Sequence, residues 1–397
     1  MPIPVDTIYS QMRHSHLHAL LDWCLRSIAG APEGSPGYRD LYWDAEAGSF
    51  RWYFPWSNSA ERIEALLWAG RALDRPDAIE AALRYATTMA ASRRGIASHT
   101  GTMADGMVWY WRESGSYMTN YTMRVPPAFL EAALFWKHPA FEGLAILAGE
   151  ALLRFQQSSG MLACGWYEGG AHRDITPYSI NSRVIYAVWT FAALFVHTGE
   201  SRWHNALERF VDSLIPLQNA DGSFPAEFST TGERYPSRFP KGHYHSYALY
   251  GLARASLLLP GEERLRKLAL SLGEHLLQED LLLGGNVYGN MMTDGDGERA
   301  VWRSVTPDFA AGYAWLHRLT GDPRFLQAAR RTLVNAFLRQ FGPEAPEPLR
   351  GGVPVWTAGH GAAIPAFGGF YNFWLLLAAK GMDDGVQAIE PRRRDCR

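Results

Sequence analysis

The chain has 397 residues, of which 47% are hydrophobic and 20% are charged, as expected of a globular protein with a large core. Its formal net charge of −2 gives no overall basic field, which excludes nucleic acid and an anionic membrane surface as main partners. The three cysteines, Cys24, Cys164 and Cys396, have no metal-like spacing, so we expect neither a disulfide framework nor a zinc site.

The N-terminal segment lacks the basic region, apolar run and cleavage site of a signal peptide, and no segment has the length of a membrane span. We therefore expect a cytoplasmic protein, or a secreted one if a leader has been trimmed from this sequence. His14, His16 and His18 alternate along one predicted helix, and a spacing of two does not place all three on one face. We expect no metal site there and no cofactor.

Helical periodicity dominates the sequence, with apolar residues recurring three and four apart over segments of fifteen to twenty residues. Turn and start signals such as Gly199-Glu200-Ser201 and Gly321-Asp322-Pro323 separate neighbouring segments. The predicted helices are 7–29, 58–74, 76–92, 121–137, 139–158, 179–198, 201–217, 243–259, 262–278, 304–320, 323–340 and 367–380.

The spacing of these helices predicts an all-α, (α/α)6 toroid. Helices joined by only a few residues must form antiparallel hairpins, and the first and last helices complete a sixth pair by closing the ring. The long connections all enter one helix of each pair at its N-terminus, so one end of the barrel carries every long loop. We interpret residues 1–397 as a single domain, with 381–397 as a polar tail. The long connections are 31–57, 93–120, 159–178, 218–242, 279–303 and 341–366.

Amide, guanidinium, imidazole and phenol side chains recur where the predicted inner helices begin, whereas carboxylates are scarce there. Helix N-termini also gather unpaired N–H groups and the positive end of the helix dipole, so this end of the barrel suits an anion. The candidate catalytic residues are His243, Tyr244, His245, Tyr247, Asn181 and Arg303. The candidate substrate-binding residues are Arg183, Tyr178, Asn120, Arg124, Trp302, Tyr371, Trp166 and His360.

An anion that could use such residues in chemistry is a uronic acid. Removing the proton beside its carboxylate builds negative charge on that carboxylate, which Asn and Arg donors stabilise at about 3–4 kcal/mol each. The base must be a group with a pKa near 7, or a tyrosine whose pKa of about 10 is lowered by neighbouring cations. A phenol can also return a proton to the leaving glycosidic oxygen. These residue types therefore suffice for β-elimination without a metal.

The stretch 218–252 resembles the catalytic toroid of the chondroitin, hyaluronate and xanthan lyases, because Asp221-Gly222-Ser223-Phe224 leads through a loop to Tyr247 and Tyr250-Gly251-Leu252. The resemblance implies that an anionic uronate glycan is the substrate. It also implies a catalytic histidine at 243 or 245, a catalytic tyrosine at 244 or 247, a carboxylate-neutralising Asn181 and an assisting Arg303. A fainter similarity of the same loop is to glucuronyl C5-epimerases.

The leading hypothesis is a polysaccharide or oligosaccharide lyase that acts on a uronic-acid glycan. A glycoside hydrolase is the first alternative, with its acid and base drawn from Glu168, Asp174, Glu227 and Asp308. A uronate epimerase is the second alternative. A glycan-binding protein without catalysis ranks below these, because the groups that converge can transfer protons and exceed what binding alone needs.

Overall fold

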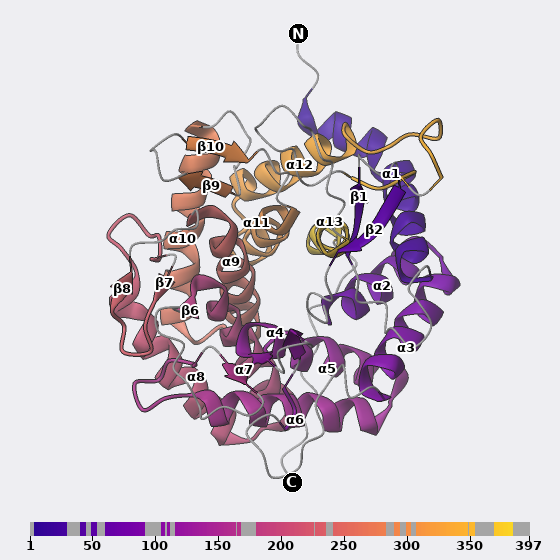
Figure 1. Ribbon diagram of the computed structural model, residues 1–397. Helices are drawn as coiled ribbons and strands as arrows, with labels where there is room; N and C mark the ends of the chain where they lie inside the picture. The colour runs from indigo at the N-terminus through magenta and orange to yellow at the C-terminus, as the bar shows by residue number, and fades with distance from the viewer. Residues whose placement is uncertain are drawn as a thin grey trace.

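The helices of the computed structural model form a closed ring (Figure 1). The structure describes residues 4–29, 40–44, 49–53, 60–91, 105–107, 109–111, 116–163, 165–167, 180–225, 227–235, 241–282, 290–293, 299–302, 307–347, 349–353 and 369–383. Within these ranges, no helix is both long and apolar enough to cross a membrane.

An inner ring of six helices surrounds the barrel axis, and each packs against the next until the last meets the first. In order around the ring these are α2 (Glu61–Ala72), α5 (Val125–Trp136), α7 (Ala187–Thr198), α9 (Lys241–Leu258), α11 (Pro307–Thr320) and α13 (Gly369–Gly381). The contact between α13 and α2 closes the ring. The predicted (α/α)6 toroid is confirmed.

An outer helix accompanies each inner one, and α1 completes the set by packing against α12 and α13. The outer helices are α1 (Val5–Ala29), α3 (Pro76–Ala91), α6 (Pro139–Phe155), α8 (Ser201–Leu214), α10 (Glu263–Leu282) and α12 (Pro323–Phe337). The two rings differ in how their residues are buried. Ala187–Leu194 of α7 is buried on every side, whereas α8 buries a single stripe that includes Trp203, Leu207 and Phe210, as expected of a helix with one face in solvent.

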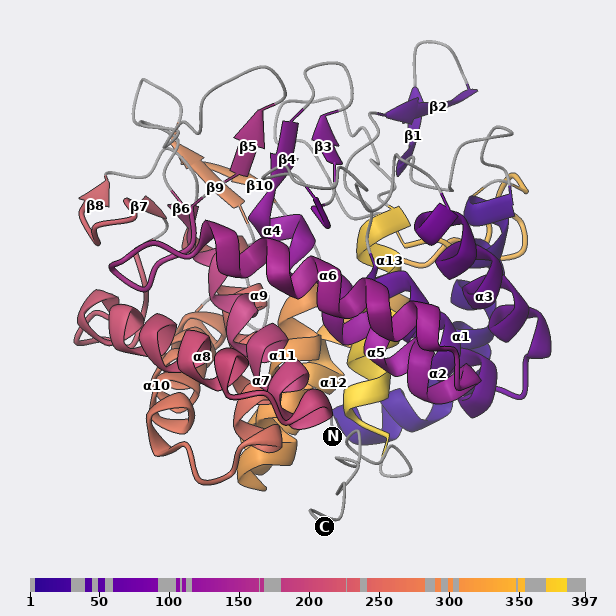
Figure 2. The ribbon, with the colours of Figure 1, turned by 90° about the horizontal axis from the view of Figure 1, so that it is seen from below.

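Short strands lie together at one end of the barrel, which we call the loop end (Figure 2). They form antiparallel ladders between the connections: β1 (Asp40–Asp44) with β2 (Ser49–Tyr53), β3 (Trp109–Trp111) with β4 (Ser116–Met118) and β5 (Gly165–Tyr167), β6 (Ile180–Asn181) with β7 (Glu227–Phe228) and β8 (Arg234–Tyr235), and β9 (Asn290–Thr293) with β10 (Arg299–Trp302). Helical periodicity does not predict these strands, because a search for a helical repeat does not detect backbone pairing between extended segments.

Two predicted inner helices begin differently from the prediction. The segment predicted as helix 179–198 starts as β6 and a 3-10 turn, η1 (Ser182–Tyr186), before α7 begins. The segment predicted as 121–137 is divided into α4 (Thr119–Thr122) and α5, because Pro126 and Pro127 are placed to begin a helix rather than to continue one. Both breaks lie at the loop end and carry candidate site residues.

A repeated glycine turn fastens the connections to the outer helices. Gly106, Gly160, Gly222 and Gly351 all have φ between +77° and +91°. A Cβ at any of them would lie 2.0–2.4 Å from a carbonyl oxygen of an outer helix, so only glycine fits.

A glutamine secures three of these four turns. Gln156, Gln218 and Gln340 each donate from Nε2 both to the carbonyl of the turn glycine and to a carbonyl of the next outer helix. The run Asp221–Phe224 belongs to the second of these glutamine-secured turns, which gives the motif a structural role in holding the ring together.

Candidate functional site

One stripe of α9 points into the barrel and carries three phenols and a guanidinium. Tyr244, Tyr247, Tyr250 and Arg254 are three to four residues apart, which places them on one face of the helix over about 15 Å of its length. Because α9 begins at the loop end, Tyr244 lies nearest to the connections and Arg254 lies deepest. His245 lies off this stripe.

The upper half of the stripe meets two arginines, and we call Arg124, Arg183, Tyr244 and Tyr247 the loop-side cluster. The Arg183 guanidinium carbon lies 4.7 Å from the ring centre of Tyr244 and 5.1 Å from that of Tyr247. The Arg124 guanidinium carbon lies 4.8 Å from the Tyr247 ring. The Tyr247 ring therefore contacts two cations, an arrangement in which the ring quadrupole attracts positive charge.

Burial decreases through this cluster toward the loop end. Tyr247 and Arg124 are fully buried, whereas Tyr244 and Arg183 are partly exposed. Burial raises the pKa of Tyr244, and the nearby Arg183 cation opposes this effect without reversing it. The expectation that neighbouring cations lower the pKa of the catalytic tyrosine is therefore wrong for Tyr244. This phenol stays protonated at neutral pH and is suited to donate a proton.

A buried carboxylate, that of Glu61, pairs with the Arg124 guanidinium. Glu61 Oε1, in the first turn of α2, lies 3.1 Å from Arg124 Nε, and both side chains are almost completely buried. Burial raises the pKa of Glu61, although the Arg124 cation acts in the opposite direction. Arg124 also lies 5.1 Å from the Tyr121 ring centre, so the residue preceding α5 is held by a carboxylate and two aromatic rings.

A second set of charges lies deeper in the barrel, and we call Glu64, Glu131, Tyr250, Arg254 and Lys380 the axial cluster. Lys380 Nζ lies 3.0 Å from Glu64 Oε1 and 2.7 Å from Glu131 Oε1. Arg254 Nη1 donates to Glu64 Oε1 and to the Tyr250 hydroxyl.

Aromatic rings enclose the axial guanidinium. The Arg254 guanidinium carbon lies 3.9 Å from the ring of Trp189 and 4.1 Å from that of Trp315. With these two rings, all six inner helices contribute a side chain to this part of the interior.

The axial charges are paired within the cluster. Burial alone would raise the pKa of Glu64, but Arg254 and Lys380 lower it to about 2. Burial raises the pKa of Glu131, which shares Lys380 and is the more accessible carboxylate, with 21% of its side chain exposed. Two carboxylates thus face two cations, so each charge of the cluster has a partner of opposite sign without a ligand.

His245 and Asn372 make equivalent contacts with two of the glycine turns. His245 Nε2 lies 3.1 Å from the amide nitrogen and 2.8 Å from the carbonyl oxygen of Phe224, two residues after Gly222. Asn372 bonds both backbone groups of Val353, two residues after Gly351. With 1% of its surface exposed, His245 occupies a position in which another copy of the same device uses an amide.

The carboxylates considered for hydrolysis are dispersed. Asp308 is fully buried and accepts a hydrogen bond of 2.5 Å from Ser246 Oγ, whereas Glu227 is partly exposed in β7 and lies near Tyr244. Glu168 and Asp174 lie outside the described residues. Within the described part of the chain, these positions do not form an opposed pair of exposed carboxylates.

The remaining candidates lie at the loop end or outside the described residues. Asn181 pairs with Glu227 through the β6–β7 ladder, two residues before Arg183, so its backbone lies beside the loop-side cluster. Asn120 is a buried residue of α4, directly after β4. The backbones of Trp166, Trp302, His243 and Tyr371 belong to β5, β10, α9 and α13, and their side chains are outside the described set. Tyr178, Arg303 and His360 lie outside the described residues altogether.

Sequence reasoning missed the carboxylates that support these cations. Glu61 and Glu64 were assigned no role, although both lie in the first two turns of a predicted inner helix. An acidic residue in an otherwise apolar inner helix is a signal for a buried ion pair, because an unpaired buried charge is costly. The identity of the partners could not be inferred, since Arg254 is 190 residues from Glu64.

Comparison with solved structures supports the (α/α)6 toroid fold. No protein-family model matches the chain, and no curated protein matches it in sequence. Solved structures do match it over nearly its full length. The cellobiose 2-epimerase of Spirochaeta thermophila has a TM-score of 0.71 at 14% identity, over 95% of this chain and 96% of that one.

Two further similar structures are named for other enzymes. An unsaturated glucuronyl hydrolase from a Bacillus species has a TM-score of 0.65 at 15% identity, over 93% of this chain and 97% of that one. An α-amylase from Clostridium perfringens has a TM-score of 0.61 at 14% identity, over 94% and 98%. At these identities the likeness shows the shared (α/α)6 toroid and does not transfer an activity.

Proposed function

We propose that the protein is an enzyme that cleaves a uronic-acid-containing glycan by β-elimination at the loop end of the toroid. The observation that carries the proposal is the stacking of Arg183 on Tyr244, which places a cation and a protonated phenol side by side where the barrel is partly exposed. The similar structures named for sugar epimerases and for an unsaturated glucuronyl hydrolase support a carbohydrate substrate.

In this mechanism Arg183, with Asn181, binds the uronate carboxylate and stabilises the charge that develops on it. We assign His243 as the base that removes the proton beside the carboxylate, because the neighbouring His245 is engaged with the Phe224 backbone. The electron pair of that C–H bond forms the new double bond as the bond to the leaving glycosidic oxygen breaks. Tyr244 donates its proton to this oxygen. Tyr247 and Arg124 hold Arg183 and Tyr244 in position.

The direct test is the ultraviolet absorbance of the conjugated 4,5-unsaturated uronate that elimination creates. The full chain is incubated with a panel of uronate oligosaccharides, and reducing ends and absorbance are followed together. The proposal predicts that both rise in equal amounts. New reducing ends without the chromophore would contradict elimination, and loss of that activity in Glu227→Gln but not in Tyr244→Phe would indicate hydrolysis.

Epimerisation is the second candidate, because it shares the first step and because structures named as sugar epimerases are among those most similar in fold. An epimerase returns a proton to the carbon from which it removed one, so no bond to the neighbouring sugar breaks. Reaction in D₂O separates the two outcomes: deuterium beside the carboxylate of an intact oligosaccharide indicates epimerisation, whereas shortened chains with the chromophore indicate elimination.

A further inference from the structure

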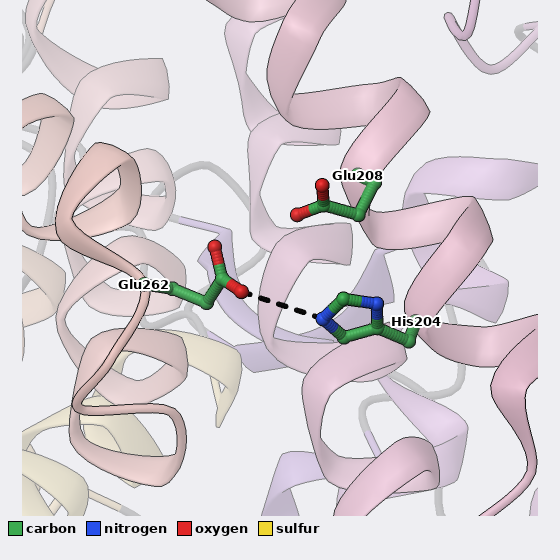
Figure 3. Close-up of side chains that lie close together, drawn as sticks. All are labelled: His204, Glu208 and Glu262. Carbon is green, nitrogen blue, oxygen red and sulfur yellow. Dashed lines mark hydrogen bonds and ion pairs between the residues drawn. The ribbon is translucent and has the colours of Figure 1, made fainter.

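A histidine and a glutamate of α8 lie close to a glutamate of the turn before α10, on the side of the barrel (Figure 3). His204 and Glu208 are one turn apart on α8, and Glu262 directly precedes α10. One potential ligand atom from each of the three lies within 4.8 Å of the others, and His204 Nε2 is 3.4 Å from Glu262 Oε1. All three side chains are partly buried, with 25–34% of each exposed.

The carboxylates here outnumber the cations that contact them. Arg264 pairs with Glu208, with Asp212 at 2.7 Å and with Glu262 at 3.4 Å, so one guanidinium serves three carboxylates. The two oxygens of Glu262 contact different partners. Oε2 faces Arg264, whereas Oε1 faces His204. A carboxylate has enough lone pairs to bind a guanidinium with one oxygen and a metal ion with the other.

We propose that His204, Glu208 and Glu262 form a binding site for Zn²⁺ or a similar first-row divalent cation. One imidazole nitrogen and two carboxylate oxygens are a known ligand set for such ions, with ligand bonds of about 2.0–2.2 Å. Ligand atoms around a tetrahedral ion are then about 3.3 Å apart, so the side chains need to approach one another by up to about 1.5 Å. Water completes the coordination, and the excess of carboxylates attracts the cation.

Metal bound at this position would join the α7–α8 hairpin to the α9–α10 hairpin on the outside of the ring. The ligands come from outer helices and from the turn before α10, whereas the loop-side cluster lies on inner helices. We therefore expect the ion to stabilise the fold by mass action and to have no part in the uronate chemistry. The site is independent of the proposed function, and its test needs no substrate.

The test is isothermal titration calorimetry of ZnCl₂ into the chelator-treated full chain. All proteins carry His14→Ala and His18→Ala, because these rings lie 4.4 Å apart on α1 and could bind zinc themselves. We expect one ion per chain. His204→Ala should weaken binding at least about 10-fold, and Glu208→Gln and Glu262→Gln should each weaken it by a similar factor.

Arg264→Gln distinguishes a three-ligand site from adventitious binding to a histidine. Removing the guanidinium releases the carboxylates and adds local negative charge, so zinc should bind several-fold more tightly. His197 provides the matched control, since it lies 2.9 Å from Glu142 but is outside the three-residue group. His197→Ala should leave the zinc affinity unchanged.

The parent protein here is the chain with only His14→Ala and His18→Ala. Three results would overturn the site: no zinc binding by this parent, unchanged affinity in His204→Ala, or unchanged affinity in both glutamate variants. The melting temperature measured without metal shows whether each variant is folded. In the parent protein, saturating zinc should raise this temperature by a few degrees. The same addition should not raise it in His204→Ala.

Discussion

The loop-side cluster and the axial cluster both place arginine against tyrosine in the interior of one barrel, yet they differ in access. In the axial cluster Arg254 lies between Trp189 and Trp315 and is hydrogen-bonded to Glu64. All six inner helices contribute side chains to this region. In the loop-side cluster Arg183 lies on the ring of Tyr244, and both residues are partly exposed.

The difference shows that residue chemistry alone does not identify a site. Tyr244 and Tyr250 lie on one stripe of one helix, six residues apart, and burial raises the pKa of both phenols. Tyr250 is fully buried and accepts a hydrogen bond from Arg254, so we assign it a structural role. Tyr244 lies at the loop end and is partly exposed. Under our proposal, depth along the inner helices therefore separates a proton donor from a structural phenol.

The largest expected effect on stability comes from opening the axial cluster. Arg254→Met removes the cation bonded to Glu64 and leaves a buried carboxylate with only Lys380 to balance it. Loss of one partner of a buried ion pair costs about 3–5 kcal/mol, which urea unfolding will measure. Arg202→Met is the control, because Arg202 pairs with Glu150 on the surface, where such pairs contribute about 0–1 kcal/mol. Equal losses in the two variants would contradict the structural role of the axial cluster.

The next effect is on catalysis at the loop end. Arg183→Gln removes the cation proposed to bind the uronate carboxylate, so we expect turnover to fall about 10²–10³-fold. Arg183→Lys should recover only part of this activity, because an ammonium lacks the planar group that stacks on Tyr244. Arg318→Gln is the control, since Arg318 also lies over an aromatic ring, that of Trp315. Full turnover in Arg183→Gln would remove Arg183 from the mechanism.

A smaller effect is expected at His245, which lies at the depth of the loop-side cluster but on another face of α9. His245→Ala removes the imidazole contacts with the buried backbone of Phe224 and should lower the unfolding free energy by about 1–3 kcal/mol. Turnover per folded molecule should stay within about 10-fold of the parent value. A loss of turnover as large as that of Arg183→Gln, with unchanged stability, would make His245 a catalytic residue instead.

The smallest effect concerns alkaline pH. Burial raises the pKa of Tyr186 and Tyr250 well above the ordinary value of 10.0. Above about pH 10 the unfolded chain loses these protons while the folded protein keeps them, so stability falls as pH rises and is unaffected below pH 10. The slope is about 1.4 kcal/mol per pH unit for each such tyrosine. Urea unfolding between pH 9 and pH 11 should show a shallower slope in Tyr250→Phe, and an unchanged slope would contradict this.

The fold was predictable from the sequence because its determinants are local. Apolar periodicity and stop signals such as Gly199, which has a φ of +73°, mark the helices, and the short turns force the hairpins. The pairing of β6 with β7 could not be predicted, since these segments are more than forty residues apart, as in Asn181 with Glu227.

The candidate site was predictable only in outline. The positions of Tyr244 and Arg183 at inner-helix starts follow from the helix order, and the structure brings the two side chains together. The run Asp221–Phe224 was interpreted through a family resemblance, but its contacts are those of a turn that recurs around the ring. The axial cluster was missed because Lys380 and Glu64 are 316 residues apart and meet only when the ring closes.

The central claim is that the loop end carries the chemistry and the axis carries the structure. The most direct test is the turnover of a uronate oligosaccharide by Tyr244→Phe and Tyr250→Phe, two identical changes on one face of α9. We predict that Tyr244→Phe lowers turnover about 10²–10⁴-fold and keeps the melting temperature, whereas Tyr250→Phe lowers the melting temperature and keeps most of the turnover. The reverse pattern, or equal losses of turnover in both variants, would contradict the account.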